Sequence, residues 1–590
     1  MKKLVCFSLA LMMFCFLGLE TMATEQTPNR LVTGVVFSDL NADGKLDQGE
    51  PGIANVCVSN SKEVVQTDSA GRFRLPAYDE MIIFVTKPAD YDYPLNENHL
   101  PKFSYIHQPL GSPAAIQKYR GLNPTGDLPA QLHFPLLPSK NVSKNFKAII
   151  TGDTQVYNNN EIGYLRDTLV KEAAATKASF VLTVGDNIGD DLSLYPRYLS
   201  VMKGMNKPVY LTPGNHDVNL DTPDYAHSLD TFKREFGPTY YSFNYGKVHF
   251  VVLDTVYYPS TIYAHSYHGE IDPVQMEWLK NDLSYVPFDH LIILSMHIPI
   301  VSFVDRLHEQ HHVKNRTGLY ALLRGRKVVA LAGHTHTTEQ FLPGEMEEGW
   351  IEPIALREMI IGAACGSWWS GDTDEYGVPF SFEKCGSPKN YMIFNFNGAD
   401  YQENFKAIGK SQNAQMNLSF WTPSFEQWFQ AQKNWYSANP QIRPATPPFT
   451  QANLPDPAAL KDSELAASKL VINVWDGNSS SKVSCRFDKG KPLLAVRNTD
   501  IGDPAALRDQ LSTTRYAIGF SIYNNKIKPD EPQPLPGLFA TSSTHIWTCP
   551  LPSKLKPGLH EVRVSVEDPV SKHRYVELKQ FEVVDGKEDL

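Results

Sequence analysis

The sequence lacks several features that would point to common functional classes. Its 7 cysteines include no CxxC pair, which argues against a cysteine-based metal site. Its formal net charge is −10, with 55 Lys and Arg against 65 Asp and Glu, so no nucleic-acid polymer is expected as partner, because phosphate backbones need basic patches. A small phosphorylated substrate stays compatible with this charge, since bound metal ions supply positive charge locally.

The cysteines also do not form a disulfide framework. Cys6 and Cys15 lie in the apolar segment at the start of the chain, which leaves an odd number spread over a long sequence. Export would permit two pairings of the remaining cysteines, Cys485 with Cys549 and Cys365 with Cys385, while Cys57 stays single.

Long hydrophobic runs are missing outside the N-terminus. Lys2 and Lys3 precede an apolar run over residues 4–19, and Thr21-Met22-Ala23 offers a small-residue cleavage site. Residues 1–23 are therefore predicted to be a signal peptide, with an uncleaved anchor helix as the alternative. The expected location is periplasmic or extracellular, with no membrane span after signal removal.

At 590 residues the chain is too long for a single core. We predict a β-sandwich over residues 28–139, an α/β domain over 144–412, a linker over 413–465 rich in Pro, Gln and Asn, and a second β-sandwich over 466–590. The strands predicted for the outer domains are 32–37, 56–58 and 81–85 in the first, and 470–475, 516–522 and 560–566 in the last.

Two helices can be placed in the α/β domain. Apolar residues recur at intervals of three and four over 161–178, which predicts an amphipathic helix. A second helix is predicted to begin after Asp272 as N-cap, with Pro273 in the first helical position and Gln275 completing a capping box.

Five segments of the α/β domain share one design, in which a buried apolar strand ends in polar residues able to bind metals. In a parallel sheet the carboxyl ends of the strands gather along one edge, where ligands bind. A glycine precedes the polar residues in all but one segment and lets the backbone turn off the strand. The segments are Gly152-Asp153-Thr154-Gln155, Gly185-Asp186-Asn187, Gly214-Asn215-His216-Asp217, Met296-His297 and Gly333-His334-Thr335-His336.

These residue types suit a two-metal site. Carboxylate, amide oxygen and imidazole together bind Mn, Fe or Zn. A carboxylate such as Asp186 can bridge two ions about 3.5–4 Å apart, the separation found in two-metal phosphatases.

The ordered motifs GD-x-Q, GDN, GNHD, MH and GHTH resemble those of the calcineurin-like metallophosphoesterases, over roughly residues 145–365. The resemblance implies a four-layer β-sandwich core with helices, flanked by β-domains as in exported bacterial members. It implies one metal held by Asp153, Gln155, Asp186 and His336, and another held by Asp186, Asn215, His297 and His334. Asp186 and His216 are the implied catalytic residues, with Asp186 bridging and His216 beside the phosphate.

The first motif departs from the family pattern, which usually has histidine where this chain has Gln155. An amide oxygen is a weaker and harder ligand, so this metal is expected to bind less tightly or to favour Mn over Zn. In the family His216 commonly contacts an aspartate that follows the bridging one, and both Asp190 and Asp191 are candidates.

Residues beside the predicted metals are candidates for substrate contact. Asn187 follows the bridging aspartate directly. Trp368 and Trp369 lie between glycines and could form a platform for a sugar or base, or could be buried against the linker. A histidine cluster, His308, His311 and His312, could flank the substrate or lie in a solvated loop.

Residues 39–50 match a twelve-residue calcium loop. Gly44 provides the turn, and the strand-like flanks argue against an EF-hand pair. A plain acidic turn is the alternative to a structural calcium site. The predicted ligands are Asp39, Asn41, Asp43, the Lys45 carbonyl, Asp47 and Glu50.

The predicted function is hydrolysis of a phosphomonoester or phosphodiester, in which two cations lower the pKa of a bridging water to give the attacking hydroxide. The substrate would be small, with a sugar or nucleotide as the linked group. The alternative is a surface carbohydrate-binding or adhesion-type protein with a degenerate phosphoesterase core. Gln155 alone favours that alternative, and the intact ligand set favours the enzyme.

Overall fold

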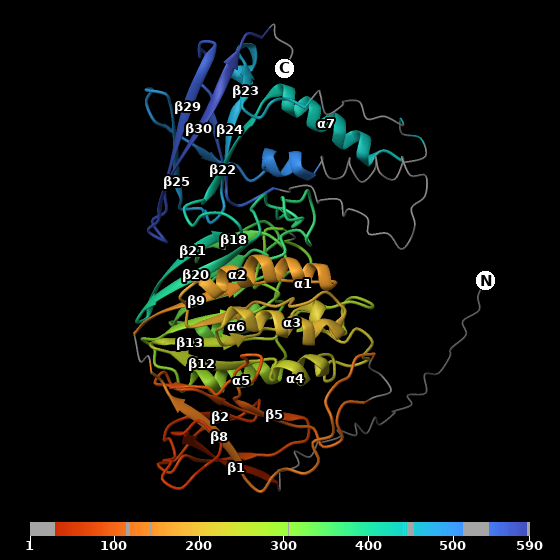
Figure 1. Ribbon diagram of the computed structural model, residues 1–590, viewed down its shortest axis with the longest axis vertical. Helices are drawn as coiled ribbons and strands as arrows, with labels where there is room; N and C mark the ends of the chain where they lie inside the picture. Colours follow the sequence, from red (N-terminus) through yellow and green to blue (C-terminus); the bar gives the residue numbers. More distant parts are fainter. Residues whose placement is uncertain are drawn as a thin grey trace, which may run out of the picture.

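The computed structural model describes residues 30–113, 118–140, 144–304, 306–439, 442, 444, 454–510 and 542–586. The predicted signal peptide and the predicted strand at 516–522 lie outside these residues. Three parts follow one another along the long axis of the molecule, and Figure 1 shows the first at the bottom and the last at the top. Within the described ranges, no helix has the length and apolar character needed to cross a bilayer.

The N-terminal part is a β-sandwich whose two sheets have the strand orders β4-β1-β8-β6 and β3-β2-β5-β7. The two sheets share a buried core that includes Val36, Phe73 and Phe84. The strands are β1 Leu31–Ser38, β2 Cys57–Ser59, β3 Val64–Gln66, β4 Arg72–Pro76, β5 Met81–Thr86, β6 Tyr91–Asp92, β7 Ser104–His107 and β8 Leu132–Pro138.

The central part contains two mixed sheets. The first has the order β11-β10-β9-β20-β21 and the second the order β12-β13-β16-β17-β19-β18. The strands of the first are β9 Asn145–Thr151, β10 Phe180–Thr183, β11 Val209–Tyr210, β20 Asn390–Asn397 and β21 Asp400–Ala407. Those of the second are β12 Tyr241–Tyr245, β13 Val248–Val252, β16 Leu291–Ser295, β17 Lys327–Ala332, β18 Thr338–Phe341 and β19 Arg357–Ile361, and a separate ribbon pairs β14 Val256–Tyr257 with β15 His268–Gly269.

Alternation along the strands places the two sheets face to face with helices outside them. On β9, Ala148 and Ile150 join a cluster that includes Phe250 of the second sheet, whereas Ile149 joins one with Ile162 and Tyr198 on the helices. Because successive strand residues point to opposite faces, both faces of this sheet are buried. The core is therefore the α/β sandwich with outer helices that the family resemblance implies. Its helices are α1 Asn159–Leu165, α2 Lys171–Ala175, α3 Tyr195–Met202, α4 Asp230–Phe236, α5 Pro273–Leu283 and α6 Arg316–Leu323.

Two predicted helices are present, with differences in detail. The predicted helix at 161–178 corresponds to α1, a π-helical turn Arg166–Val170 and α2. Asp272 caps α5 by accepting from Val274 N at 2.8 Å, as predicted. Gln275 does not complete a capping box, because its amide bonds the backbone of Asp254 at 2.8 and 2.9 Å and ties the helix to the end of β13.

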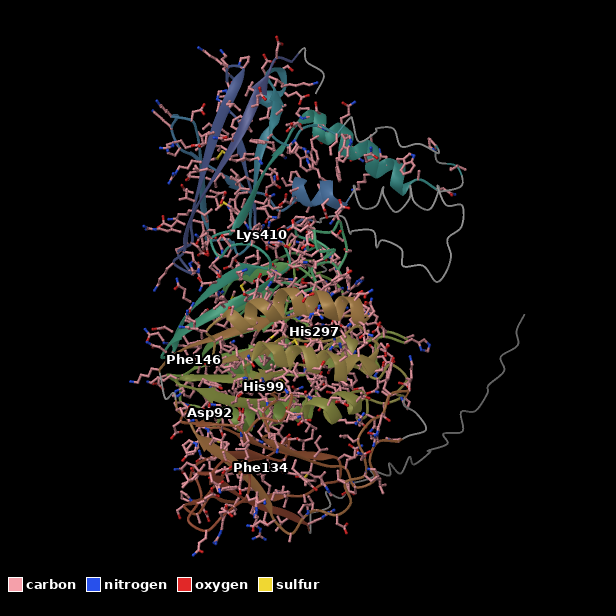
Figure 2. The ribbon with its side chains drawn as sticks, in the orientation of Figure 1. Asp92, His99, Phe134, Phe146, His297 and Lys410 are labelled. Atoms are coloured by element: carbon pink, nitrogen blue, oxygen red, sulfur yellow. A yellow bond between two sulfur atoms is a disulfide. The ribbon has the colours of Figure 1, made fainter. Side chains whose placement is uncertain are left out.

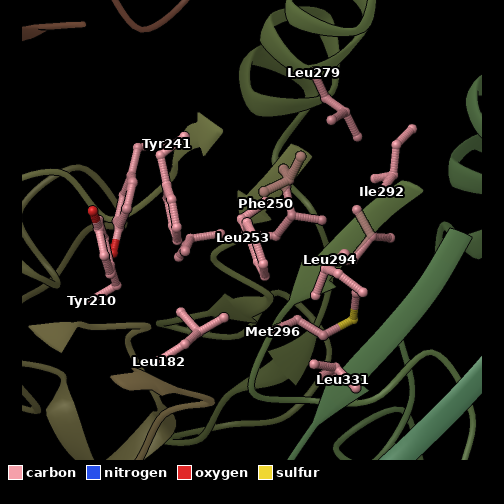
Figure 3. Close-up of a cluster of buried hydrophobic side chains, with 14 of the residues drawn as sticks. Leu182, Tyr210, Tyr241, Phe250, Leu253, Leu279, Ile292, Leu294, Met296 and Leu331 are labelled. Carbon is pink, nitrogen blue, oxygen red and sulfur yellow. The ribbon is translucent and has the colours of Figure 1, made fainter. Parts of the chain in front are cut away.

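The hydrophobic interior reaches the ends of the strands that carry the motifs. Figure 3 shows Leu294, Met296 and Leu331 packed with Phe250 and Leu253, all buried. Met296 N also donates to Leu331 O at 3.0 Å, which fixes the chain after β16 against β17. The residue that follows Met296 is thereby held at the same edge.

The C-terminal part is a second sandwich, and it includes a segment that the sequence analysis assigned to the linker. Met416–Trp421 forms strand β22, which pairs antiparallel with β24. Its alternate residues Met416, Leu418 and Phe420 are buried, a period-2 pattern obscured by the polar composition around it. Helix α7 Pro423–Ser437 follows, capped by Thr422 Oγ1, which accepts from Phe425 N at 3.0 Å.

The two sheets of this sandwich have the orders β22-β24-β28-β27 and β23-β30-β29-β25-β26. A disulfide joins Cys485 to Cys549 and so links the sheets, whereas Cys57, Cys365 and Cys385 are free thiols. The strands are β23 Ala459–Lys461, β24 Lys469–Val474, β25 Lys482–Phe487, β26 Leu493–Leu494, β27 Val496–Arg497, β28 Ile546–Pro550, β29 Gly558–Glu567 and β30 Arg574–Val584.

Both outer domains contact the core through polar groups. Lys87 Nζ of the first domain donates to Asn244 O at 2.7 Å. On the other side, Gln340 Nε2 donates to Asp476 O at 3.0 Å, and Asn473 Nδ2 to Cys385 O at 3.3 Å.

Candidate dinuclear metal centre

The predicted ligands meet at the carboxyl ends of strands from both central sheets. Asp153, Asp186 and Asn215 follow β9, β10 and β11, and the histidines follow β16 and β17. Figure 2 locates His297 inside the central part. The side chains are buried, with exposed fractions of 0% for Asp153, Gln155 and His297, 1% for Asp186 and His336, 5% for Asn215 and 8% for His334.

Four of the seven ligands form one tight group. His297 Nε2 lies 3.1 Å from Asp186 Oδ2, 2.9 Å from Asn215 Oδ1 and 3.2 Å from His334 Nδ1. Among the described residues, Asp186, His297 and His334 are the set of three whose ligand atoms all lie within 4.8 Å of one another. Ligand atoms about 3 Å apart match the edges of a metal coordination sphere with bonds of about 2 Å.

The three histidines are oriented by backbone carbonyls. His297 Nδ1 contacts Val184 O at 3.0 Å, His334 Nε2 contacts Gln310 O at 2.9 Å, and His336 Nδ1 contacts Gly366 O at 2.5 Å. Each of these nitrogens must carry the hydrogen, because a carbonyl oxygen only accepts. In the neutral ring the other nitrogen carries the lone pair and faces the site, as metal-binding histidines require.

The remaining ligands form a second, looser group. His336 Nε2 lies 3.6 Å from Asp153 Oδ1. Gln155 Nε2 donates to Tyr157 OH at 3.1 Å, while Gln155 Oε1 is buried and has no hydrogen-bond partner. An orphaned buried oxygen is costly unless a cation binds it, so Gln155 fits a metal ligand.

The backbone at the ligands is strained in a way that directs the side chains. Non-glycine residues with positive φ are uncommon, and they gather at functional sites. Here they include Asp153 at 47°, Gln155 at 32°, Asp186 at 47°, His334 at 77° and His336 at 53°.

The glycines of the motifs leave room for the ligands. A β-carbon would lie 2.5 Å from His297 Nδ1 at Gly185, 2.2 Å from Asp186 Oδ1 at Gly214, and 2.3 Å from Asp153 Oδ2 at Gly333. These distances are far below van der Waals contact, so the packing of the ligands requires glycine at all three positions.

Burial and mutual attraction set the charges in this site. Burial raises the pKa of Asp153 to about 8 and lowers the pKa of His336 to about 3. Burial also disfavours charge on Asp186 and His297, but their attraction outweighs it: the pKa of Asp186 falls below its ordinary value, and that of His297 rises to about 9. Carboxylate and imidazole groups crowded in this way fit two divalent cations, which would replace the protons.

His216 lies beside the ligands, and Asp190 is its partner. His216 Nδ1 lies 2.8 Å from Asp190 Oδ1, and its Nε2 lies 4.0 Å from Asp186 Oδ2. Asp191 instead caps a short helix by accepting from Ser193 N at 3.1 Å. Of the two candidate aspartates, Asp190 is therefore the one that contacts His216.

Asn187 does not line the site, contrary to our prediction. It is fully buried, and its amide nitrogen donates to Thr212 O at 2.9 Å and to Asp217 Oδ2 at 3.0 Å. Its oxygen accepts from Thr183 Oγ1 at 3.1 Å. These bonds hold the motif loops together, so Asn187 cannot contact a substrate.

The two tryptophans have different surroundings. Trp369 is 3% exposed, donates through Nε1 to Thr154 O at 3.1 Å and packs near Tyr164, so it is buried. Trp368 is half-buried and stacks on His336, with ring centroids 4.3 Å apart and an interplanar angle of 26°. Only Trp368 is placed to contact a substrate.

The members of the histidine cluster, His308, His311 and His312, also differ in their surroundings. His311 packs on His334 with ring centroids 4.9 Å apart, so it borders the site. His308 is exposed and His312 is buried at 3%.

Sequence reasoning missed two residues of the site. Lys384 places Nζ 5.0 Å from the centre of the Trp368 ring, and after burial its charge is the next cause of the low pKa of His336. Tyr157 contacts Gln155 and lies edge-on to His216, with ring centroids 6.1 Å apart. Tyr157 is two residues from a predicted ligand and could have been suspected; Lys384 has no local sequence signal.

Comparison with known proteins assigns the family. Sequence models match the chain in three segments: the N-terminal domain of calcineurin-like phosphoesterases over residues 40–119, the calcineurin-like phosphoesterase domain itself over 146–338, and the C-terminal domain over 358–573. A search of curated proteins gives no match.

Similar solved structures include a dimetal phosphatase from Danio rerio, with 14% identity and a TM-score of 0.30, covering 45% of this chain and 96% of that one. A structure of PhoD has 14% identity and a TM-score of 0.34, covering 63% of this chain and 85% of the other. Their TM-scores are too low to support an argument, so the assignment rests on the three sequence models. The chain belongs to the calcineurin-like metallophosphoesterases and carries the phosphoesterase domain between that family's N- and C-terminal domains.

Proposed function

We propose that this protein hydrolyses a small phosphomonoester or phosphodiester with the aid of two divalent ions, Mn, Fe or Zn. The observation that carries the proposal is the meeting of seven buried ligands from both sheets, in which the free nitrogen of each histidine faces the site. The alternative of a degenerate binding protein predicts a damaged ligand set, whereas Gln155 still has a buried oxygen without a hydrogen-bond partner, as a metal ligand would.

When bound, two cations held by these residues would supply Lewis-acid charge and make hydroxide available as nucleophile near neutral pH. The protein's own residues orient the substrate. The Asn215 amide lies beside His297 and the His216 imidazole lies near Asp186, and both can donate to phosphoryl oxygens. Asp190 holds the Nδ1–H of His216, which leaves Nε2 facing the site to protonate the leaving oxygen.

The test is Mn²⁺-dependent hydrolysis of p-nitrophenyl phosphate and bis-p-nitrophenyl phosphate by the full chain. Asp186→Ala removes the bridging carboxylate and should lower kcat/KM by at least about 10³-fold. Asp167→Ala is the matched control, because Asp167 is an exposed partner of Arg166 away from the site. Equal rates for the wild type and Asp186→Ala would refute the proposal.

The organic part of the substrate is proposed to be a sugar or a nucleotide. The half-buried ring of Trp368, fixed by stacking on His336, supports a flat or ring-shaped group next to the phosphate. A screen of sugar phosphates and nucleotides, repeated with Trp368→Ala, tests this. If Trp368→Ala lost activity only on p-nitrophenyl esters, the proposed sugar or nucleotide group would be contradicted.

We also propose that the protein is exported to the periplasm or the cell exterior. The basic and apolar start of the sequence supports this, as does the disulfide between Cys485 and Cys549, a bond that persists in oxidising compartments. Fractionation of cells producing the full chain, followed by immunoblotting, tests the proposal; a protein that stays in the cytosol at full length would contradict it.

The loop over residues 39–50 is proposed to bind a structural calcium ion. Asp39 is 2% exposed, and its Oδ1 has no hydrogen-bond partner, while its Oδ2 accepts from Gly44 N at 2.9 Å. A buried carboxylate oxygen without a partner is compensated when a cation occupies the loop. Glu50, at the end of the loop, is held by Leu40 N at 2.8 Å.

Calcium titration of the full chain, saturated with Mn²⁺, tests this second site. The wild type should bind one Ca²⁺ with a Kd on the order of 10⁻⁴ to 10⁻³ M, as extracellular sites do. Asp39→Ala should abolish this binding, and Asp79→Ala, an exposed carboxylate of the same domain, should not. Identical titration curves for the wild type and Asp39→Ala would exclude the site.

A further inference from the structure

Gln155 poses a problem that histidine would not. An amide has two ends of similar size, an oxygen that can bind a cation and an NH₂ group that cannot. Rotation of the terminal torsion by half a turn exchanges the two ends, and such torsions are roughly two-fold. A glutamine ligand therefore works only where another group fixes its orientation.

Tyr157 provides that group. Gln155 Nε2 donates to Tyr157 OH at 3.1 Å, which turns Oε1 away from the hydroxyl. Oε1 is then the atom left without a partner in a side chain that is 0% exposed. A reversed amide would have to accept from the hydroxyl instead. Tyr157 is 38% exposed, so its hydroxyl can donate its own hydrogen to solvent and act as the acceptor toward Gln155.

The tyrosine ring is itself held in place. A β-carbon on Gly189 would lie 2.5 Å from Tyr157 Cε1, so the ring packs directly on this glycine. Gly189 N donates to Val156 O at 3.0 Å, which joins the segment after β9 to the one after β10. The ring also meets His216 edge-on at 6.1 Å between centroids. The hydroxyl is therefore presented to Gln155 from a fixed position.

We propose that Tyr157 is a positioning residue, which orients the Gln155 amide so that its oxygen faces the metal shared with Asp153 and His336. This inference rests on the proposed function, because it assigns Gln155 to one of the two metals. It also explains how this chain keeps a two-metal site with an amide where the family usually has an imidazole. The other ion, held through His297 and His334, does not depend on Tyr157.

Tyr157→Phe keeps the ring and removes only the hydroxyl. The amide is then free to rotate, and its NH₂ group can face the cation. Partners of metal ligands of this kind typically change affinity by about 10- to 100-fold when lost. Isothermal titration with Mn²⁺ should therefore show one of the two binding events weakened by this factor and the other unchanged. Tyr376→Phe, at a tyrosine that is 83% exposed, is the matched control.

A second background separates positioning from a general structural role. In Gln155→His the ligand no longer has two exchangeable ends, so adding Tyr157→Phe should change Mn²⁺ affinity by less than about threefold. A purely structural role predicts the same loss in both backgrounds, and that result would overturn the inference. Thermal melting of each variant checks that the fold persists.

The outcomes also separate this inference from the proposed function. A wild type that binds no Mn²⁺ and hydrolyses no ester would remove the proposed function. A wild type that binds two ions, together with a Tyr157→Phe variant that binds both with unchanged affinity, would remove only the role of Tyr157.

Discussion

Gly185 offers a sharp test of how the metal centre is packed, because the residue contributes no side chain to the chemistry. A β-carbon at this position would lie 2.5 Å from His297 Nδ1 and 2.6 Å from His297 Cγ. Ordinary contact needs about 3.5 Å, so Gly185→Ala must displace the imidazole or its own strand end by about 1 Å. The backbone φ of 98° adds further strain for alanine.

A misplacement of about 1 Å in a catalytic group costs about 10²-fold in rate. We therefore expect Gly185→Ala to lower kcat/KM for p-nitrophenyl phosphate by about 100-fold, equivalent to about 2.7 kcal/mol. The Mn²⁺ ion bound through His297 should also be weakened. Steady-state kinetics with a Mn²⁺ titration by calorimetry measures both effects.

Two other glycines separate the effect of backbone strain from the effect of the overlap with His297. Gly377 has a φ of 80° and no atom within 4 Å of an added β-carbon, so Gly377→Ala introduces the backbone strain without the overlap. Gly163, in α1, has neither problem, and Gly163→Ala should be neutral or stabilising by up to about 1 kcal/mol. The reasoning is refuted if Gly185→Ala binds two ions with wild-type affinity and retains a rate within about threefold of the wild type.

Further substitutions address the other residues. Asp190→Asn should lower kcat by about 10- to 100-fold because His216 loses its charged partner. Asp191→Asn, at the helix cap, should keep kcat within about twofold of the wild type. Equal losses of kcat in steady-state assays of the two variants would contradict the pairing of His216 with Asp190. Lys384→Gln should raise KM for a monoester by about 10-fold with a smaller change in kcat, and Lys384→Arg should largely restore it; a change in kcat alone would show that the cation does not bind substrate. Cys485→Ser with Cys549→Ser should destabilise the C-terminal domain by about 4 kcal/mol, from the 64-residue separation of the cysteines; denaturant unfolding measures this, and an unchanged midpoint would count against it.

The strand-end motifs allowed candidate metal ligands to be chosen because part of the constraint is topological. Parallel strands bring their carboxyl ends to one edge whatever their separation in the chain, which places Asp153 and Asp186 at neighbouring strand ends. The pairing of Asp153 with His336 came from the family resemblance, because their strands β9 and β17 belong to different sheets. The helix cap at Asp272 was equally local. These features depend on a few neighbouring residues and on a general rule of sheet geometry.

The errors arose where a residue's role depends on contacts distant in the chain. Asn187 follows a ligand directly, yet its amide is used by Thr212 and Asp217, and nothing in its neighbourhood indicates this. Trp368 and Trp369 are adjacent and alike in sequence, but only one is buried against α1. Strand β22 was missed because its alternating pattern is short and its partner β24 begins 48 residues after Trp421.

The origin of the ligands has a consequence for the whole central part. Asp153, Asp186 and Asn215 belong to one sheet, and all three histidine ligands belong to the other. Cations bound by both sets of residues would cross-link the two sheets, so sliding one sheet over the other would have to break bonds to metal. Resistance to unfolding should accordingly rise with the logarithm of free metal concentration, even in His216→Ala, which loses a catalytic group but keeps all seven predicted ligands.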